Sequence, residues 1–131
     1  MFVDASALTT MLTNEQDARE LLARMQTYQI RTTSPLAVWE TIVAVARVLG
    51  LEIEESETAV EAFLKLTNTV VVAVPAEART LASGAFARFG KGRHPAALNF
   101  GDCFAYACAR CADAPLLYKG DDFPRTDIET A

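Results

Sequence analysis

The segment TVVVAV at 69–74 limits the fold more than any other part of the chain, because it is apolar on both faces. A strand of that kind is typical of the centre of a parallel sheet, where helices cover both sides. Helical patterns flank this segment, one at 53–67 and one from Pro75 to about Phe89. Strands that alternate with helices predict an α/β fold, a three-layer α/β/α sandwich around a mostly parallel central sheet.

Short runs between the helical patterns provide the remaining strands of this sheet. We expect them at residues 1–4, at 29–33, in LLYK at 116–119, and as a short closing strand around 126–129. In a parallel sheet of this type, ligands gather outside the carboxyl ends of the strands. Polar side chains that directly follow a strand are therefore the first candidates for a functional site.

Capping residues predict where the helices begin and end. Ser34 followed by Pro35 is a strong helix start, and Gly50 is a typical helix end. Asn99 predicts the start of a helix that runs to about residue 112. Ser6 is an N-cap candidate for a helix through residue 12, and Asn14 for an amphipathic helix through residue 26.

Composition narrows the class of protein. With 131 residues and 51% hydrophobic content, the chain is expected to form one domain with its own core. The net charge of −5 argues against a protein that coats nucleic acid nonspecifically, but it leaves room for a nuclease whose acids bind metal. We recognise no membrane span and no signal peptide. The odd set Cys103, Cys108 and Cys111 suits a reducing cytoplasm and core packing.

Carboxylates occupy four settings where a purely structural protein would rarely place them. Asp4 follows the first strand in MFVDASAL, and Asp121 and Asp122 follow the last long strand in LLYKGDDF. Glu40 and Asp102 lie within apolar helical patterns, SPLAVWETIVAVAR and NFGDCFAYACAR. Buried carboxylates are costly unless they are paired, protonated or bound to a cation, so these acids suggest convergence on one metal. Oxygen ligands without matching histidines or cysteines favour Mg²⁺ or Mn²⁺ over zinc.

Each acid also has a purely structural interpretation. Asp4 fits a turn or a cap after a strand, the pair after residue 120 fits a turn, and Asp102 fits the first turn of a helix. Glu40 lies six residues past Ser34, too deep for a capping box, but a pair with Arg47 would account for it. The residues alone leave these alternatives open.

The chain resembles the PIN-domain family and, within it, the VapC-type toxins of bacterial toxin–antitoxin pairs. The resemblance extends over nearly the whole chain and rests on four segments, MFVDASAL, SPLAVWET, GKGRHPAALNFGDCFAYACAR and LLYKGDDFPRTDI. It implies a single PIN-like nuclease domain over residues 1–131, with the three-layer sandwich described above.

The resemblance also implies a function, an Mg²⁺-dependent endoribonuclease with Mn²⁺ as a substitute, located in the cytoplasm and without a membrane role. The catalytic and metal-binding acids would be Asp4, Glu40, Asp102 and Asp122. Asp121 is the alternative to Asp122, although many relatives carry Asn at that position. Expected partners are RNA, a second copy in a homodimer, and a small VapB-like antitoxin that docks on helices 14–26 and 34–67.

Four further residues are expected to support or contact the substrate. Ser6 would support the acids or touch RNA, and Arg88, Lys91 and Arg93 would contact phosphates beside the pocket. Two other functions stay open, a catalytically silent PIN-like binding or regulatory module and a metal-dependent phosphatase. A metal-dependent cleavage assay separates the silent module from a nuclease, and a phosphatase for small substrates would not need the basic loop.

Overall fold

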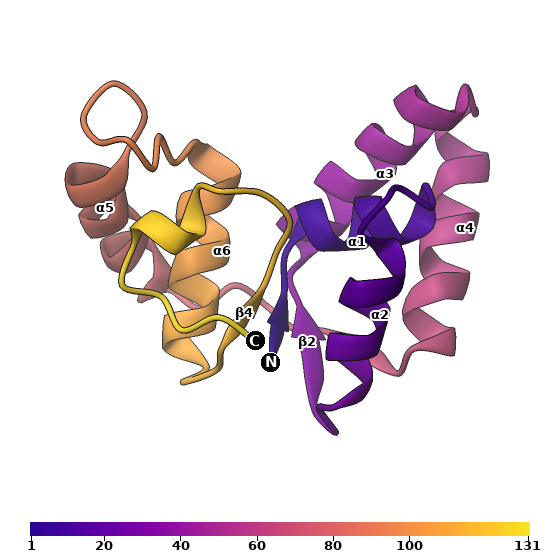
Figure 1. Cartoon of the computed structure of the whole chain (residues 1–131), viewed down its shortest axis with the longest axis horizontal. Helices are drawn as coiled ribbons and strands as arrows, with labels where there is room; N and C mark the ends of the chain where they lie inside the picture. Colours follow the sequence, from indigo (N-terminus) through magenta and orange to yellow (C-terminus); the bar gives the residue numbers. More distant parts are fainter.

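The structure, a computed structural model, describes all residues from Met1 to Ala131. Strands and helices alternate along most of the chain (Figure 1). The strands are β1 (Phe2–Val3), β2 (Arg31–Thr33), β3 (Thr69–Val71) and β4 (Leu116–Leu117). The helices are α1 (Ala5–Leu12), α2 (Ala18–Gln26), α3 (Pro35–Leu49), α4 (Ile53–Leu66), α5 (Ala78–Phe89), α6 (Phe100–Cys111) and the 3-10 helix η1 (Phe123–Arg125).

The four strands form one sheet in the order β3-β2-β1-β4, and every neighbouring pair is parallel. Phe2 is in register with Thr32 on one side and with Leu116 on the other. Because the strands run in the same direction, the segments that leave β1, β2 and β4 start at the same edge of the sheet. The predicted parallel sheet is confirmed.

Helices cover both faces of this sheet (Figure 1). Successive strand residues point to opposite faces, so Phe2 and Leu116 pack into a core with α5 and α6. Val3 and Leu117 pack on the other face, into a core with α1, α2, α3 and α4. Two separate cores on one sheet make the three-layer α/β/α sandwich that the sequence predicts.

Several predicted helix ends are confirmed at atomic detail. The Ser34 hydroxyl accepts a hydrogen bond of 3.2 Å from the Ala37 N–H, and Pro35 is the first residue of α3. Gly50 ends α3 with a φ of 66°, a left-handed conformation that glycine adopts without strain. Asn99 caps α6 through a hydrogen bond of 3.0 Å from the Asp102 N–H.

The segment TVVVAV does not lie at the centre of the sheet, so that prediction was wrong. Only its first half forms β3, and β3 is an edge strand. Val70 and Val71 are 59% and 45% exposed. The two inner strands are β2 and β1, and the two residues of β1 are too few to produce a recognisable pattern. Apolar residues on both faces therefore did not indicate burial on both faces here.

Two helix starts differ from the predicted ones. Asp4, rather than Ser6, caps α1, because its carboxylate accepts a hydrogen bond from the Ser6 N–H. Asp17, rather than Asn14, occupies the N-cap position of α2. Asn14 has a φ of 54° and belongs to the turn between the two helices.

The segments around Pro75 and the C-terminus also depart from prediction. Pro75 precedes a turn in which its carbonyl accepts a hydrogen bond from the Ala78 N–H, and α5 begins at Ala78. No strand forms at 126–129; η1 precedes this segment, and Thr130 alone makes a parallel bridge to Leu116. That bridge covers part of the open edge of β4.

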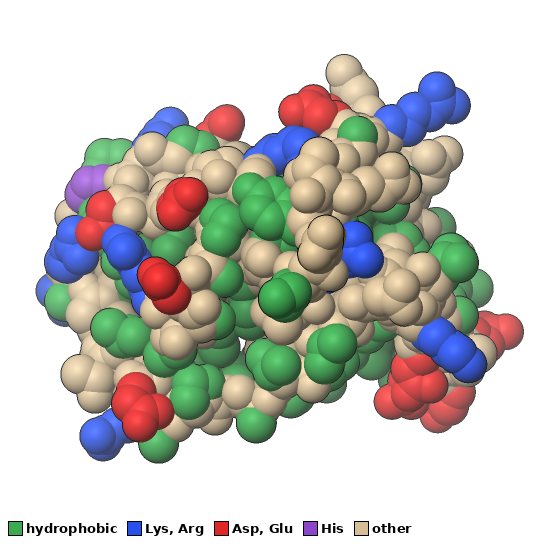
Figure 2. Space-filling model, turned by 90° about the horizontal axis from the view of Figure 1, so that it is seen from below, with side chains coloured by type: hydrophobic (Ala, Val, Ile, Leu, Met, Phe, Trp, Pro, Cys, Tyr) green, Lys and Arg blue, Asp and Glu red, His purple; other side chains and the backbone are tan.

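The end of the molecule from which the strands start carries a mixed surface. Figure 2, the view from below, shows hydrophobic side chains across the middle and lower part of this face, with charged groups on both sides. None of the helices combines the length and apolar character that crossing a membrane requires. The carboxyl ends of the strands lie at the opposite end.

Candidate active site

Asp4 leaves the carboxyl end of β1 and is 4% exposed. Its Oδ2 accepts hydrogen bonds from the Ser6 backbone N–H at 3.0 Å and from the Ser6 hydroxyl at 2.5 Å. Burial raises the pKa of Asp4 above its usual value, and the Ser6 hydrogen bonds act in the opposite direction. Asp4 is therefore both a helix cap, as its structural interpretation held, and a buried acid at the carboxyl edge of the sheet.

Glu40 lies on the second turn of α3, the helix that follows β2, and is half-buried. Burial raises its pKa to about 7, and the negative charges of Asp4 and Asp102 contribute to the rise. The structure contains no ion pair between Glu40 and Arg47, the pair that would have made Glu40 an ordinary surface residue. Glu40 faces two other acids instead.

Asp102 lies in the first turn of α6, where it completes a capping box with Asn99. Its Oδ2 accepts a hydrogen bond of 2.8 Å from the Asn99 N–H, which fixes the carboxylate at the helix start. Burial raises the pKa of Asp102 to about 6; the Asn99 hydrogen bond opposes the rise, and the charges of Asp4 and Asp122 add to it. The cap and the acidic site thus share one carboxylate.

These three acids line one hollow of about 420 Å³, called the acidic cleft below. Its walls come from α1, α3, α6 and the segment after β4, all at the carboxyl edge of the sheet, as the fold predicts. The lining residues are Asp4, Ala5, Ser6, Thr9, Thr10, Glu15, Glu40, Ala44, Arg47, Asn99, Asp102 and Lys119. The sequence analysis did not predict Glu15, Arg47 and Lys119 as cleft residues. Only Arg47 had a signal in the sequence, namely its spacing from Glu40 on one helix.

Asp121 and Asp122 occupy different surroundings. Asp121 lines a neighbouring hollow of about 510 Å³ together with Asp17 and Lys119, and it does not line the acidic cleft. Asp122 does not line the cleft either, but its charge is among the causes that raise the pKa of Asp102. The choice of Asp122 as the fourth acid stays a prediction, and its electrostatic contact with Asp102 favours it.

Of the four residues expected at the substrate, only Ser6 lines the cleft. Arg88 forms an ion pair of 2.9 Å with Asp127, which Tyr106 also contacts through its hydroxyl. Lys91 and Arg93 lie in the exposed turn after α5, where the Arg93 guanidinium lies 5.5 Å from the centre of the Phe86 ring. None of these three cations belongs to the lining of the acidic cleft.

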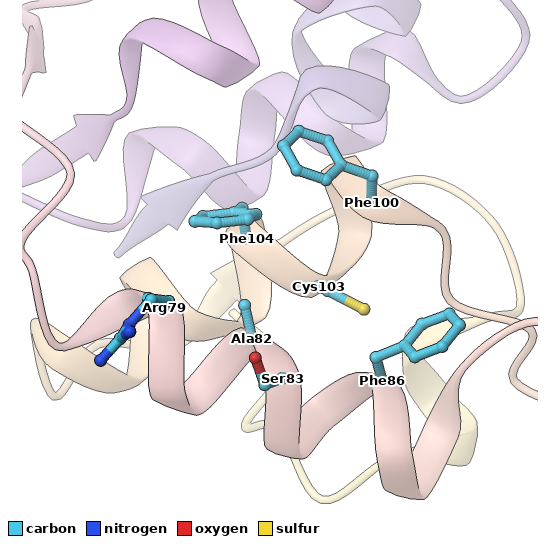
Figure 3. Close-up of a pocket in the computed structure, with 7 residues that line it drawn as sticks. All are labelled: Arg79, Ala82, Ser83, Phe86, Phe100, Cys103 and Phe104. Carbon is cyan, nitrogen blue, oxygen red and sulfur yellow. The ribbon is translucent and has the colours of Figure 1, made fainter.

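A third hollow, of about 450 Å³, has a different character (Figure 3). Phe100 and Phe104 of α6 lie on one side of it, and Phe86 of α5 lies on the other. Arg79 and Cys103 are its only titratable residues, and burial raises the pKa of the Cys103 thiol to about 11. This hollow offers apolar contact area, and its lining contains no carboxylate or histidine that could activate Ser83 or Cys103.

The donor set of the acidic cleft suits a hard divalent cation. Carboxylate oxygens without histidine or thiolate are the ligands of Mg²⁺ and Mn²⁺. As the side chains lie, however, no three acidic, cysteine or histidine residues are close enough to hold one ion together. Burial and, to a smaller extent, the repulsion of like charges raise the pKa values of Glu40 and Asp102, and a cation would relieve that repulsion by drawing the carboxylates inward.

The cysteines do not compete for this role. Cys103 and Cys108 are buried in the core beside α5, and Cys111 is exposed. Burial raises the pKa of both core thiols to about 11, so they stay protonated at neutral pH and are poor metal ligands. Core packing, the predicted role, is confirmed for these two.

Comparison with known proteins agrees with this architecture. The PIN domain family model matches residues 1–129. A VapC ribonuclease of Mycobacterium bovis and ribonuclease VapC30 of Mycobacterium tuberculosis are each 38% identical over 130 residues, covering 99% of this chain and 97% of the relative. A VapC ribonuclease of Rhizobium meliloti is 34% identical over 139 residues, covering 97% of this chain and 98% of the relative.

A solved structure supports the same fold. The crystal structure of Mycobacterium tuberculosis VapC20, described as a sarcin-ricin loop cleaving toxin, matches with a TM-score of 0.76 and covers 99% of this chain and 97% of that one. At 18% sequence identity, this likeness concerns the fold alone. The family match and the 38% identical relatives carry the assignment, and this chain belongs to the PIN-domain family and, within it, to the VapC ribonucleases.

Proposed function

We propose that this chain is a metal-dependent endoribonuclease and the toxin of a type II toxin–antitoxin pair. The observation that carries the proposal is the convergence of Asp4, Glu40 and Asp102, from three separate segments, on one cleft at the carboxyl edge of the sheet. The relatives that are 38% identical to this chain are named VapC ribonucleases, which supports a role of this cleft in RNA cleavage. A cytoplasmic site of action belongs to the proposal, because three free thiols suit a reducing compartment.

The proposed cofactor is Mg²⁺, with Mn²⁺ as a substitute, held by Asp4, Glu40, Asp102 and Asp122. When bound, such an ion activates a water for in-line attack on a phosphodiester and stabilises the charge that develops on the phosphoryl oxygens. Ser6 holds Oδ2 of Asp4 by two hydrogen bonds and so fixes the direction of that carboxylate. Asn99 does the same for Asp102. No nucleophilic side chain is required, and no covalent intermediate is expected.

The two other functions have less support. A catalytically silent module would have no reason to keep carboxylates whose pKa values are raised by burial and by mutual repulsion. A phosphatase for small substrates fits the acids equally well. The relatives' names, however, give ribonuclease activity.

A small VapB-like antitoxin is the proposed partner, and α2 with α4 is the proposed docking surface. These helices form an apolar hollow of about 420 Å³ that Leu22, Met25, Phe63 and Leu66 help to line. Leu66 is 81% exposed, which favours its burial against an apolar surface of a partner. The homodimer stays a proposal as well, and the hollow between α5 and α6 in Figure 3 is the helical surface left for it.

The test is cleavage of total RNA by the purified protein in Mg²⁺, in Mn²⁺ and in EDTA. We expect cleavage with either metal, none in EDTA, and none for Asp102→Asn. An amide oxygen at position 102 still accepts the hydrogen bond from the Asn99 N–H, so the fold of this variant should be retained. Asp113→Asn is the matched control, because Asp113 is exposed and its φ of 47° suits Asn. Full activity of Asp102→Asn would contradict the proposed site.

A further inference from the structure

Two cations line the acidic cleft, and neither was among the expected substrate contacts. Arg47 lies on the same face of α3 as Glu40 and Ala44, at helical spacing. It is exposed and makes no ion pair and no side-chain hydrogen bond. An unpaired guanidinium on the wall of an acidic cleft is available to an anion that enters the cleft.

Lys119 lies on another wall of the acidic cleft, and both its backbone N–H and its ammonium group have partners. Its backbone N–H donates a hydrogen bond of 3.0 Å to the Ser6 hydroxyl, the same group that binds Asp4. Its ammonium group pairs with Asp17, and both side chains keep more than a third of their surface exposed. Lys119 also lines the neighbouring hollow that contains Asp121, so it stands between the two hollows.

The pairing of Asp17 with Lys119 replaces a local interaction. Asp17 occupies the N-cap position of α2, where an Asp side chain usually accepts hydrogen bonds from the first N–H groups of the helix. Here its carboxylate makes no such bond. It faces the Lys119 ammonium instead, which places a positive charge at the edge of the cleft.

We propose that Arg47 and Lys119 contact the phosphates on either side of the bond to be cut, and that Asp17 pairs with Lys119 in the free protein and competes with RNA for its ammonium group. This inference rests on the proposed function and names the residues that bring RNA to the site. A polyanion needs positive side chains to enter a cleft lined by Asp4, Glu15, Glu40 and Asp102, and these two are the only cations in that lining. RNA then runs from the acidic cleft across Lys119 into the neighbouring hollow.

The experiment measures binding of a fluorescein-labelled oligouridylate by anisotropy over a range of KCl concentrations, in EDTA so that metal and cleavage play no part. Arg47→Gln and Lys119→Gln should each weaken binding and lower the salt slope by about 0.7 per lost phosphate contact. The matched control Lys65→Gln, at the exposed end of α4, should leave the slope unchanged. A structural role alone would change the melting temperature but not the salt slope.

Three outcomes would overturn the inference. They are unchanged slopes for both variants, a loss of slope only in a Lys91→Gln, Arg93→Gln double variant, and no measurable binding by the wild type at low salt. Failure of the proposed function would look different, because the wild type would then bind oligouridylate through these cations but cut no RNA in Mg²⁺.

The competition between Asp17 and RNA for Lys119 has its own test in the same assay. Asp17→Asn removes the competing carboxylate, so it should tighten binding in EDTA, and this gain should disappear when Lys119→Gln is also present. Glu20→Gln is the control for a general change of charge, because Glu20 lines the same hollow and has no ion-pair partner. An equal gain from Glu20→Gln, or a gain that persists without Lys119, would show that Asp17 does not act through Lys119.

Discussion

The carboxylate of Glu40 lies directly against the α-carbon of Gly101. A side chain at position 101 would overlap both carboxylate oxygens, since an added Cβ would approach Oε2 to 2.6 Å and Oε1 more closely still. Gly101 is buried in the first turn of α6, next to Asp102. The missing side chain therefore lets the acid of α3 and the acid of α6 share one cleft.

Gly101→Ala should force Glu40 out of its position. Because only the end of a flexible side chain must move, we expect a small change in the free energy of unfolding but weaker Mg²⁺ binding. The control is Gly84→Ala in α5, where an added Cβ meets nothing within 4 Å. There, alanine should stabilise the helix by about 0.5–1 kcal/mol. Denaturant unfolding and a Mg²⁺ titration measure both effects, and unchanged Mg²⁺ binding by Gly101→Ala would show that the position of Glu40 beside Gly101 does not matter for the metal.

The metal-free protein should become less stable as the pH rises from about 5 to about 8. The pKa of Glu40 is raised to about 7 and that of Asp102 to about 6, so in this range the folded state holds more protons than the unfolded state. The contribution of Glu40 and Asp102 to stability is therefore greatest below this range and is lost as these groups ionise. Melting temperatures in EDTA across the range test this, and Glu40→Gln should flatten the curve. A melting temperature that rises with pH would contradict the assignment.

Asp127 does not disturb that measurement. Burial alone would raise its pKa, but hydrogen bonds from Tyr106 and Arg88, together with the positive charges of Arg88 and Arg110, lower it to about 2. A lowered carboxyl pKa contributes stability that is lost only as the pH falls toward that value. The contribution of Asp127 is thus constant over the range in which Glu40 and Asp102 titrate.

Binding of Mg²⁺ should release protons. With a pKa of about 7, a large share of Glu40 is protonated at neutral pH, and a carboxyl group must lose its proton to bind a cation. Calorimetry in two buffers of different ionisation enthalpy counts the protons released. The count should decrease as the pH rises and should fall in Glu40→Gln. Release of no protons at neutral pH would mean that Glu40 does not take part in metal binding.

Local signals in the sequence predicted some helix ends correctly and missed the starts of α1, α2 and α5 by a few residues. Ser34 with Pro35, Gly50 and Asn99 mark helix ends because each satisfies backbone groups within a few residues, and all three predictions are confirmed. The place of a strand in the sheet depends on contacts far along the chain. The apolar segment 69–74 therefore gave no sign that β3 is an edge strand, while the two-residue inner strand β1 left almost no pattern.

The same distinction applies to the site. Asp4 directly follows a strand, and Asp102 follows the helix cap Asn99. These local positions place both acids at the carboxyl edge of the sheet. The cations were harder to predict, because the loop Lys91–Arg93 looks basic in the sequence but does not line the cleft. Lys119 faces the cleft through its contacts with Ser6 and Asp17, which are more than a hundred residues away.

The last prediction concerns the two adjacent acids after β4. Asp121 lines the neighbouring hollow, whereas the charge of Asp122 raises the pKa of Asp102. Asp122→Asn should therefore weaken Mg²⁺ binding and cleavage, and it should lower the pKa of Asp102 by removing a like charge. Asp121→Asn, its matched control, should be nearly silent in both assays. A Mg²⁺ titration of cleavage by each variant, with the Asp102 pKa followed by NMR, decides the matter. The reverse order of damage would make Asp121 the fourth acid and would place the metal nearer the hollow that Asp17 and Lys119 share.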